Sequence, residues 1–164
     1  MILKESDLRR LVRQMMFESD TDVYRVKAEE VEVVYPDSIN EDLLLKGDQD
    51  EKISGFVRPE DRSIERAGIY FRDNLVGFMT PRQEVGGWRV GAIYVDSEVR
   101  KNFKGIGSIA IAKFFKGREA SDLPIGVDNI PSQIAFEKAG FVNTGEEYID
   151  KSDGWKATWW SNKI

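Results

Sequence analysis

The sequence predicts a single α+β domain over residues 1–164, built on a central mixed, largely antiparallel sheet of six to seven strands flanked by helices. Apolar segments separated by turn residues between positions 68 and 95 are typical of an antiparallel meander. After residue 95, the pattern changes to alternating helices and strands. A chain of 164 residues without repeats or long linkers fits one domain that buries a sizeable core.

The N-terminal residues carry the pattern of an amphipathic helix. Ile2 and Leu3 are expected to form a short strand, and Ser6 or Asp7 to cap the helix that follows. The apolar residues of this helix recur at intervals of three and four, which predicts a stripe facing the core: Leu8, Leu11, Val12, Met15 and Met16.

Residues 20–60 give weaker structural signals. The valines at positions 31–34 indicate a strand or a short helix, which we expect Pro36 to interrupt. Asn40 is expected to cap a turn of helix that ends at Gly47.

The meander gives the clearest strand signals. Pro81 and the Gly86-Gly87 pair are expected to bracket the connection between its last two strands. The last strand is rich in β-branched and aromatic residues, which favour pleated structure. The three expected strands cover residues 68–71, 75–79 and 88–95.

The second half of the chain alternates helices and strands. A helix should run from Gly105 to about Lys116, with Gly117 as its stop. Asn129 and Pro131 should begin a second helix, which Gly140 ends. The strands expected in this half cover residues 123–127, 146–149 and 156–160.

The residue inventory excludes several kinds of chemistry. The chain has neither cysteine nor histidine, so disulfides, Cys/His zinc sites, thiol nucleophiles and Ser-His triads are excluded. No acidic loop has the EF-hand spacing, and we therefore expect no metal. Because no stretch of 18 apolar residues and no signal-peptide core is present, we expect a cytoplasmic protein without a membrane partner.

Charge is distributed unevenly along the chain. Residues 18–51 hold twelve acidic side chains against Arg25, Lys27 and Lys46, a net charge of −9 in a chain whose total is −5. This stretch is either a solvated surface or one side of a site that attracts a cationic substrate, since the fields of like charges add over a cleft. No Lys/Arg cluster dominates the chain, which argues against a nucleic-acid partner.

A glycine loop at residues 100–108 precedes the first helix of the second half. Its glycines let the backbone approach an anion, and the following helix N-terminus offers free N–H groups. A Walker A loop is excluded because Ile109 follows Gly107-Ser108. The Rossmann fingerprint matches over residues 105–110, with Asp128 as a ribose ligand, but Val95 lies too far upstream and the preceding strands are antiparallel. Another alternative is a glycine turn that binds no ligand.

A third interpretation of the loop comes from resemblance. The segment from Ile93-Tyr94-Val95-Asp96 to Gly105-Ile106-Gly107-Ser108 resembles the acyl-CoA-binding motif of the GNAT superfamily of N-acetyltransferases, a strand followed by R/Q-x-x-G-x-G/A. Residues 128–141 resemble its second motif, N-x-x-A-x-x-x-Y-E-K-x-G-F. The resemblance covers an acyl-CoA-binding core at about residues 68–149. Residues 1–60 match loosely, where the family varies its acceptor side.

The resemblance implies an acyl-CoA-dependent N-acyltransferase that moves an acetyl group from acetyl-CoA to a primary amine of a small molecule or protein. The pyrophosphate would bind the backbone N–H groups of residues 104–108, and the pantetheine arm would lie along residues 93–95. Dimers are common in this family, and exposed strand edges would allow a homodimer. The cofactor-binding residues implied are Ile93, Tyr94, Val95, Lys101, Asn102, Phe103, Lys104, Gly105, Ile106, Gly107, Ser108, Asn129, Ser132 and Phe136.

The chain departs from the family pattern at two positions. Asn102 replaces the usual Arg or Gln, whose main contribution is a backbone N–H. Phe136 replaces the usual Tyr, and a phenyl ring has no proton to give to a departing thiolate. The acid would then be Ser132, Tyr94, Tyr148 or water, unless the step proceeds without one.

The base and the acceptor pocket each have several candidate residues. A base is needed because an alkylamine is protonated at pH 7, and Glu84, Asp96 and Glu98 are candidates. Trp155, Trp159 and Trp160 are candidates for an acceptor pocket. The alternative from another class is a catalytically inactive GNAT-like binding or structural module, which Phe136 favours. Acylation of a nucleic-acid-linked substrate is disfavoured by the net charge of −5.

Overall fold

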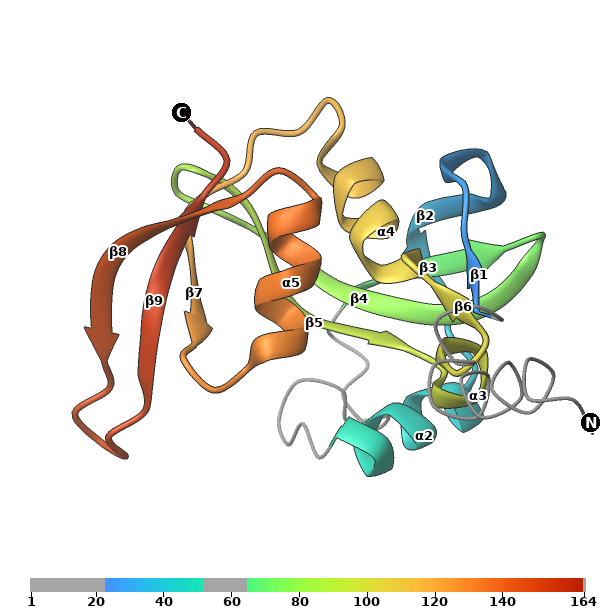
Figure 1. Cartoon of the computed structure of the whole chain (residues 1–164), viewed down its shortest axis with the longest axis horizontal. Helices are drawn as coiled ribbons and strands as arrows, with labels where there is room; N and C mark the ends of the chain where they lie inside the picture. The colour runs from blue at the N-terminus through green and yellow to red at the C-terminus, as the bar shows by residue number, and fades with distance from the viewer. Residues whose placement is uncertain (1–22, 52–64, 164) are drawn as a thin grey trace, which may run out of the picture.

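A computed structural model describes residues 23–51 and 65–163 of the chain (Figure 1). The strand and helix predicted at residues 2–16 lie outside the described residues. The described part has the predicted α+β class, with antiparallel sheets flanked by helices. None of its helices is both long and apolar enough to span a bilayer.

The first sheet has four antiparallel strands in the order β2-β3-β4-β5. They are β2 (Val31–Asp37), β3 (Arg66–Phe71), β4 (Asn74–Glu84) and β5 (Gly87–Val95). Arg72 and Asp73 close the β3–β4 hairpin with positive φ angles of 50° and 67°, the backbone twist that two-residue hairpins favour. The predicted meander is therefore confirmed.

The second sheet has three antiparallel strands, with β9 (Lys156–Ser161) between β7 (Leu123–Gly126) and β8 (Val142–Ile149). A two-residue parallel pair joins β1 (Tyr24–Arg25) to β6 (Phe103–Lys104). The described strands that were expected in one central sheet thus lie in two sheets, and the small pair was not predicted. Sequence patterns indicate strands, whereas pairing between strands depends on distant contacts.

The two larger sheets touch at one backbone junction. A parallel bridge pairs Trp88 at the start of β5 with Ala120, just before β7. The amide of Trp88 donates to the carbonyl of Glu119 at 2.7 Å. The amide of Ser121 donates to the carbonyl of Trp88 at 2.9 Å. Beyond this junction β5 and β7 pair with other strands and not with each other. A gap therefore opens between them.

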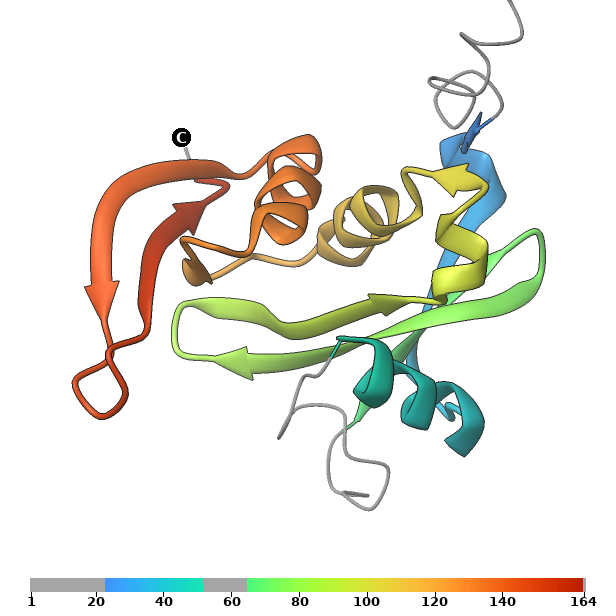
Figure 2. The same cartoon turned by 60° about the horizontal axis from the view of Figure 1, so that its bottom comes forward.

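Helices cover both faces of the first sheet (Figure 2). α4 (Ile106–Phe115) and α5 (Ile130–Lys138) lie on one face, and α2 (Glu41–Glu51) packs on the other face against β5. The short helices are η1 (Ala28–Glu30) and α3 (Ser97–Arg100).

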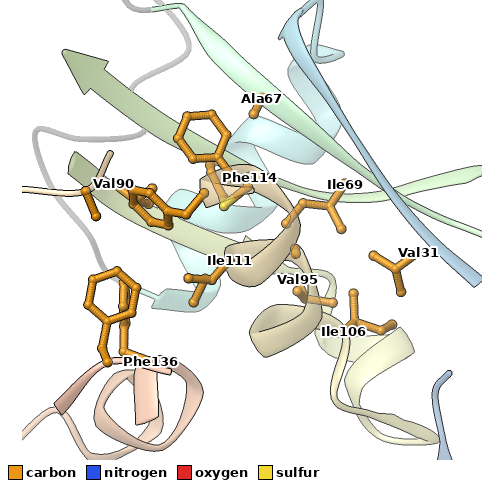
Figure 3. Close-up of a cluster of buried hydrophobic side chains, with 14 of the residues drawn as sticks. Val31, Ala67, Ile69, Val90, Val95, Ile106, Ile111, Phe114 and Phe136 are labelled. Carbon is orange, nitrogen blue, oxygen red and sulfur yellow. The ribbon is translucent and has the colours of Figure 1, made fainter. Parts of the chain in front are cut away.

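The main core lies between α4 and the first sheet (Figure 3). Ile106, Ile111 and Phe114 project from the helix towards Ile69 and Val95, and all five side chains are buried. Burying one such side chain stabilises the fold by about 1.5–3 kcal/mol. This packing fixes the N-terminus of α4 relative to the end of β5, where the glycine loop lies.

Two prolines do not interrupt their segments, contrary to prediction. Pro36 lies inside β2, where the register with β3 shifts, and β2 is an edge strand that needs no partner on its other side. Pro81 lies inside β4, beyond Met79, the last β4 residue paired with β3. Its missing N–H therefore costs no bond to β3.

The prediction that the helix after Asn40 ends at Gly47 is also wrong. Asn40 does cap α2, its side-chain oxygen accepting the amide of Leu43 at 2.8 Å. The helix continues to Glu51. Gly47 faces the sheet, where an added Cβ would lie 2.9 Å from the ring of Phe78. The glycine allows close packing here and does not terminate the helix.

Candidate functional site

The gap between β5 and β7 opens into a cavity of about 1130 Å³. Residues 90–93 of β5 line one side, and residues 123–127, from β7 and the position after it, line the other. Ile93 belongs to the core under α4, whereas Ala92 belongs to a second cluster under α2. Both residues line the cavity, which runs along the edge of the strand where residues of the two faces meet.

A bulge in β5 lies on the wall of this cavity. The β4–β5 register passes from Met79↔Ile93 to Pro81↔Val90, so Gly91 and Ala92 together oppose one residue of β4. A bulge leaves its extra residue outside the ladder of backbone hydrogen bonds. The cavity therefore meets backbone polar groups that the sheet does not fully use.

The glycine loop forms one end of the cavity. Gly105 adopts φ 100° at the N-cap of α4, a conformation that favours glycine. The first amides of α4 have no intrahelical acceptor by helix geometry. Arg100, Lys104 and residues 105–108 line the cavity here. Free amides, the positive end of a helix dipole and two cations make this end suited to a phosphate group.

Gly107 shows that the loop leaves room for a ligand. It has ordinary helical geometry, and an added Cβ would find one neighbour, the Cδ1 atom of Ile93 at 3.8 Å. Nothing in the described packing requires a glycine here. A ligand that approaches the backbone closely would require one.

The N-terminal half of α5 lines the wall opposite β5. The side chain of Asn129 caps this helix by accepting the amide of Ser132 at 3.3 Å, and Ser132 lines the cavity. Phe136 also lines the cavity but is only 3% exposed. Its ring packs edge-on against Phe141, with centroids 5.2 Å apart.

No family model and no curated protein matches the sequence, but solved structures do. The microcin C7 self-immunity acetyltransferase, solved with acetyl-CoA and AMP, matches with a TM-score of 0.57 and 16% identity, over 80% of this chain and 91% of that one. An acetyltransferase from Bacillus subtilis, solved with CoA, matches with a TM-score of 0.55 and 16% identity, over 82% and 99%.

The chain has the GNAT fold. The predicted resemblance is thereby confirmed at the level of the fold. A match to a Bacillus anthracis acetyltransferase solved with acetyl coenzyme A, at a TM-score of 0.48 and 19% identity, covers 59% of this chain and spans 60% of that protein.

The GNAT-fold sheet separates the predicted site residues by face. Ile93 and Val95 line the cavity, but Tyr94 between them packs under α2. The Tyr94 hydroxyl donates to Asp50 at 2.6 Å. Burial, followed by this hydrogen bond, raises the pKa of Tyr94. Its hydroxyl therefore lies away from the cavity.

The carboxylate candidates for a base also lie apart. Asp96 caps α3 by accepting the amide of Glu98 at 2.9 Å, and it accepts a hydrogen bond from Lys46 at 2.7 Å. Glu84, in contrast, lies between two arginines that line the cavity, at 3.5 Å from Arg82 and 3.3 Å from Arg89. Of these carboxylates, Glu84 is the one held by residues of the cavity wall.

Of the three predicted residues in the loop before Gly105, one lines the cavity and two do not. Phe103 lines the cavity and packs against Phe71 with centroids 4.8 Å apart. Lys101 and Asn102 are not among the lining residues. Lys101 pairs with Glu98 at 3.3 Å, and the carbonyl of Asn102 accepts the amide of Tyr24 at 3.0 Å.

The aromatic candidates near the C-terminus gather beside the cavity. Trp155 lines it, and Tyr148 packs edge-on against Trp155 and Trp159 at 5.9 and 5.7 Å. Trp160 is 4% exposed and belongs to the core. Asp128 lines the cavity as well.

The acidic side chains described between residues 23 and 51 do not line this cavity. Several of them support the fold. Asp37 accepts the hydroxyl of Tyr70 at 2.7 Å. Glu30 accepts hydrogen bonds from the amide of Lys27 and from the guanidinium of Arg72. These bonds, the first more than the second, lower the pKa of Glu30 from 4.5 to about 2. Among the residues that the structure describes, no cluster of acidic groups could hold a metal ion.

Sequence reasoning missed Arg82 and Arg89 as residues of the site. Both flank the turn between β4 and β5, where charged residues usually face solvent. Arg89 instead donates to the carbonyl of Asp122 at 2.8 Å and lies over the ring of Trp159 at 5.9 Å. No local pattern in the sequence identifies it, because its place depends on the junction of the two sheets at Trp88.

Proposed function

We propose that the chain is an acyl-CoA-dependent N-acyltransferase that moves an acetyl group from acetyl-CoA to a primary amine of a small molecule or protein. The observation that carries this proposal is the cavity between β5 and β7, which ends at the glycine N-terminus of α4. A polar group with negative charge fits that end, and an extended chain fits beside the open edge of β5. The GNAT fold of the chain supports the same assignment.

The described residues fit acetyl-CoA in three respects. Arg100 and Lys104 supply positive charge where free helix amides would accept a pyrophosphate. Gly107 leaves the space that a close backbone approach needs. Residues 90–95 present a strand edge that no described strand occupies on the β7 side, where an extended pantetheine arm can donate and accept hydrogen bonds.

Acetyl-CoA would supply an acyl group already activated as a thioester. The amine nitrogen forms a bond to the thioester carbon, the carbon–sulfur bond breaks, and the amine proton leaves to a base. The backbone at the Gly91–Ala92 bulge is the part of the chain that would stabilise negative charge on the thioester oxygen. We assign the base to Glu84 acting through water, because its ladder position opposite Gly87 lies four residues along β5 from Gly91. Ser132 or water would protonate the thiolate.

A second candidate function is a GNAT-fold module that binds CoA or a partner without turnover. Phe136 favours it, because this ring lies on the cavity wall where the resembling family has a Tyr. Substitution Phe136→Tyr separates the two functions. In an enzyme the new hydroxyl should change the rate of thiol release, whereas in a binding module neither form should release CoA thiol with any amine.

The first experiment is thermal unfolding of the purified chain with acetyl-CoA, with free CoA and without ligand. Ligand at about 100 times its Kd adds about 2.7 kcal/mol of stability, which raises Tm by roughly 5–10 °C for a domain of this size. An amine screen for thiol release follows. No Tm shift with either ligand at millimolar concentration would contradict the proposal.

A further inference from the structure

We propose that the acceptor amine carries an anionic group, a carboxylate or a phosphate, which Arg82 and Arg89 bind at the end of the cavity where the two sheets join. The inference rests on the proposed acyl transfer, and it narrows the acceptor to one chemical class. It also opposes the expectation from residues 18–51, whose acidic charge suggested a cationic acceptor.

The two arginines lie at the opposite end of β5 from the phosphate-binding loop. Arg82 and Arg89 are direct partners in the β4–β5 ladder, and both line the cavity. Arg89 follows Trp88, where the two sheets join, while Gly105 lies beyond the other end of the strand. The bulge at Gly91 lies two residues from Arg89, a rise of about 7 Å. An acceptor whose amine reaches the bulge therefore places its remaining groups near the arginines.

The contacts of Arg89 keep its guanidinium in place without neutralising the pair. The carbonyl of Asp122 and the ring of Trp159 hold it from the β7 and β9 side. Among the residues that the structure describes, Glu84 is the one carboxylate that pairs with Arg82 and Arg89, and the two arginines share it. One net positive charge remains. The buried Nε atom of Arg89 has no hydrogen-bond acceptor in the described structure.

The charge of the cavity wall agrees with this assignment. Six cationic side chains line the described cavity, against one acidic side chain, that of Asp128. Arg100 and Lys104 lie at the glycine loop, where the phosphates of CoA account for them. Arg89 lies six residues before Val95 on β5, a rise of about 20 Å, and Arg82 of β4 is its ladder partner, so both are too far from the loop for that role. A guanidinium pair binds a carboxylate or phosphate through directed N–H donors, and it repels a second cation on the acceptor.

The test compares three amines that share one carbon chain and differ at the far end. 5-Aminopentanoate carries a carboxylate, 5-aminopentanamide is neutral there, and 1,5-diaminopentane carries a second cation. We expect kcat/KM for thiol release to be at least about tenfold higher for 5-aminopentanoate than for the amide, and lowest for the diamine. Equal values, or a preference for the diamine, would overturn the proposal. Phosphoethanolamine against ethanolamine then tells phosphate from carboxylate as the preferred anion.

Substitution of each arginine tests whether these two residues cause the preference for a carboxylate. Arg82→Gln and Arg89→Gln should each lower the ratio of kcat/KM for 5-aminopentanoate to kcat/KM for the amide about tenfold, a ratio in which any effect on Glu84 cancels. The substitution at Arg82 should disturb the fold less, because 57% of its side chain is exposed, against 23% for Arg89. Lys116→Gln at the C-cap of α4 removes one positive charge elsewhere and should change neither value. A preference for the carboxylate that survives both arginine variants would refute the assignment.

A binding measurement separates this inference from the proposed function. Tryptophan fluorescence is titrated with 5-aminopentanoate and with its amide, in wild type and in Arg82→Gln, with free CoA present. If no amine is turned over but wild type binds the carboxylate preferentially and the variant does not, acyl transfer fails and the anion site stands. If neither turnover nor binding distinguishes the two compounds, the anion site is refuted whether or not acetyl-CoA is used.

Discussion

The two edges of β5 differ in how they are used. Towards β4, the strand is paired along almost its whole length, from Gly87 to Val95. Towards β7, it is bridged only at Trp88 among the described residues, and the rest of that edge faces the cavity. The same nine residues therefore act as a structural strand on one side and as a ligand-facing edge on the other.

Neighbouring residues of β5 also have different environments. Tyr94 is tied to α2 through Asp50, whereas Ile93 and Val95 reach the cavity. Side chains alternate across a strand, and the open edge exposes backbone in addition. Substitutions near the paired edge should alter stability, and those near the open edge should alter ligand binding.

The largest effect should come from Gly77→Ala at the paired edge. An added Cβ at Gly77 would lie 2.2 Å from the backbone oxygen of Tyr94, an atom that cannot move aside without breaking the β4–β5 pairing. We expect a loss of about 3 kcal/mol in the free energy of unfolding, or roughly 6–12 °C in Tm. Thermal unfolding measures this directly. An unchanged Tm would show that the two strands pair more loosely than described.

Gly107→Ala is the counterpart on the ligand-facing side, in α4 next to Ile93. Its Cβ would meet only Ile93, at 3.8 Å, and alanine in a helix is favoured over glycine by about 0.5–1 kcal/mol. Tm without ligand should therefore stay the same or rise slightly. Binding of acetyl-CoA should weaken about tenfold, about 1.4 kcal/mol, because the methyl group occupies the ligand's approach. Calorimetric titration checks the affinity, and undiminished binding would exclude a close ligand approach at Gly107.

A smaller effect is expected from Lys104→Gln. This exposed side chain lines the glycine-loop end of the cavity, so its loss should raise the Kd for acetyl-CoA about two- to fivefold. The matched control is Lys101→Gln, because Lys101 pairs with Glu98 and does not line the cavity. The difference between the two variants should shrink at high salt. Equal losses of affinity would place the CoA phosphates closer to Lys101 than we propose.

The smallest effect concerns the Asp50 contact beneath β5. The hydroxyl of Tyr94, and next that of Ser97, donates to Asp50 and lowers the pKa of its carboxyl below 3.8. A lowered folded-state pKa gives stability that is present above the unfolded value near 4 and is lost as pH falls through the folded value.

Asp50→Asn should therefore lower Tm slightly at pH 7 and match wild type once the pH is below the folded-state pKa. Melting curves of both proteins across this range test the sign. The Tm shift produced by acetyl-CoA at pH 7 serves as the control and should be retained, because Asp50 does not line the cavity. A Tm difference that grows as the pH falls would contradict the assignment.

Much of the fold was predictable because its signals are local. The hairpin at residues 72–74, the cap of α5 at Asn129 and the glycine at the start of α4 follow from short-range chemistry. Pro36 and Pro81 misled the prediction because a proline is tolerated where a strand has no partner on one side. That condition depends on which strands become neighbours, and local sequence does not reveal it.

The site was predictable only in part, for the same reason. The glycine loop can be recognised from its residues, and its position in the cavity follows from the order of elements. To predict that Tyr94 and Ile93 lie on opposite sides of the sheet, one must know which face of β5 each side chain occupies. The bulge at Gly91–Ala92 shifts this alternation of faces along the strand. Arg82 and Arg89 gain their place from the junction of two sheets, a contact between residues distant in the sequence.

That junction has a mechanical consequence. Since Trp88 and Ala120 form the described backbone contact between the sheets, it can serve as a pivot about which β7 swings relative to β5. β7 is about 13 Å long, so a rotation of about 5° would displace its far end by about 1 Å. A misplacement of this size can cost about a hundredfold in rate. The packing of the Trp88 ring against Tyr35 and Phe114, at 5.6 and 5.7 Å, would then keep the β5 side of this pivot fixed to the first sheet and α4.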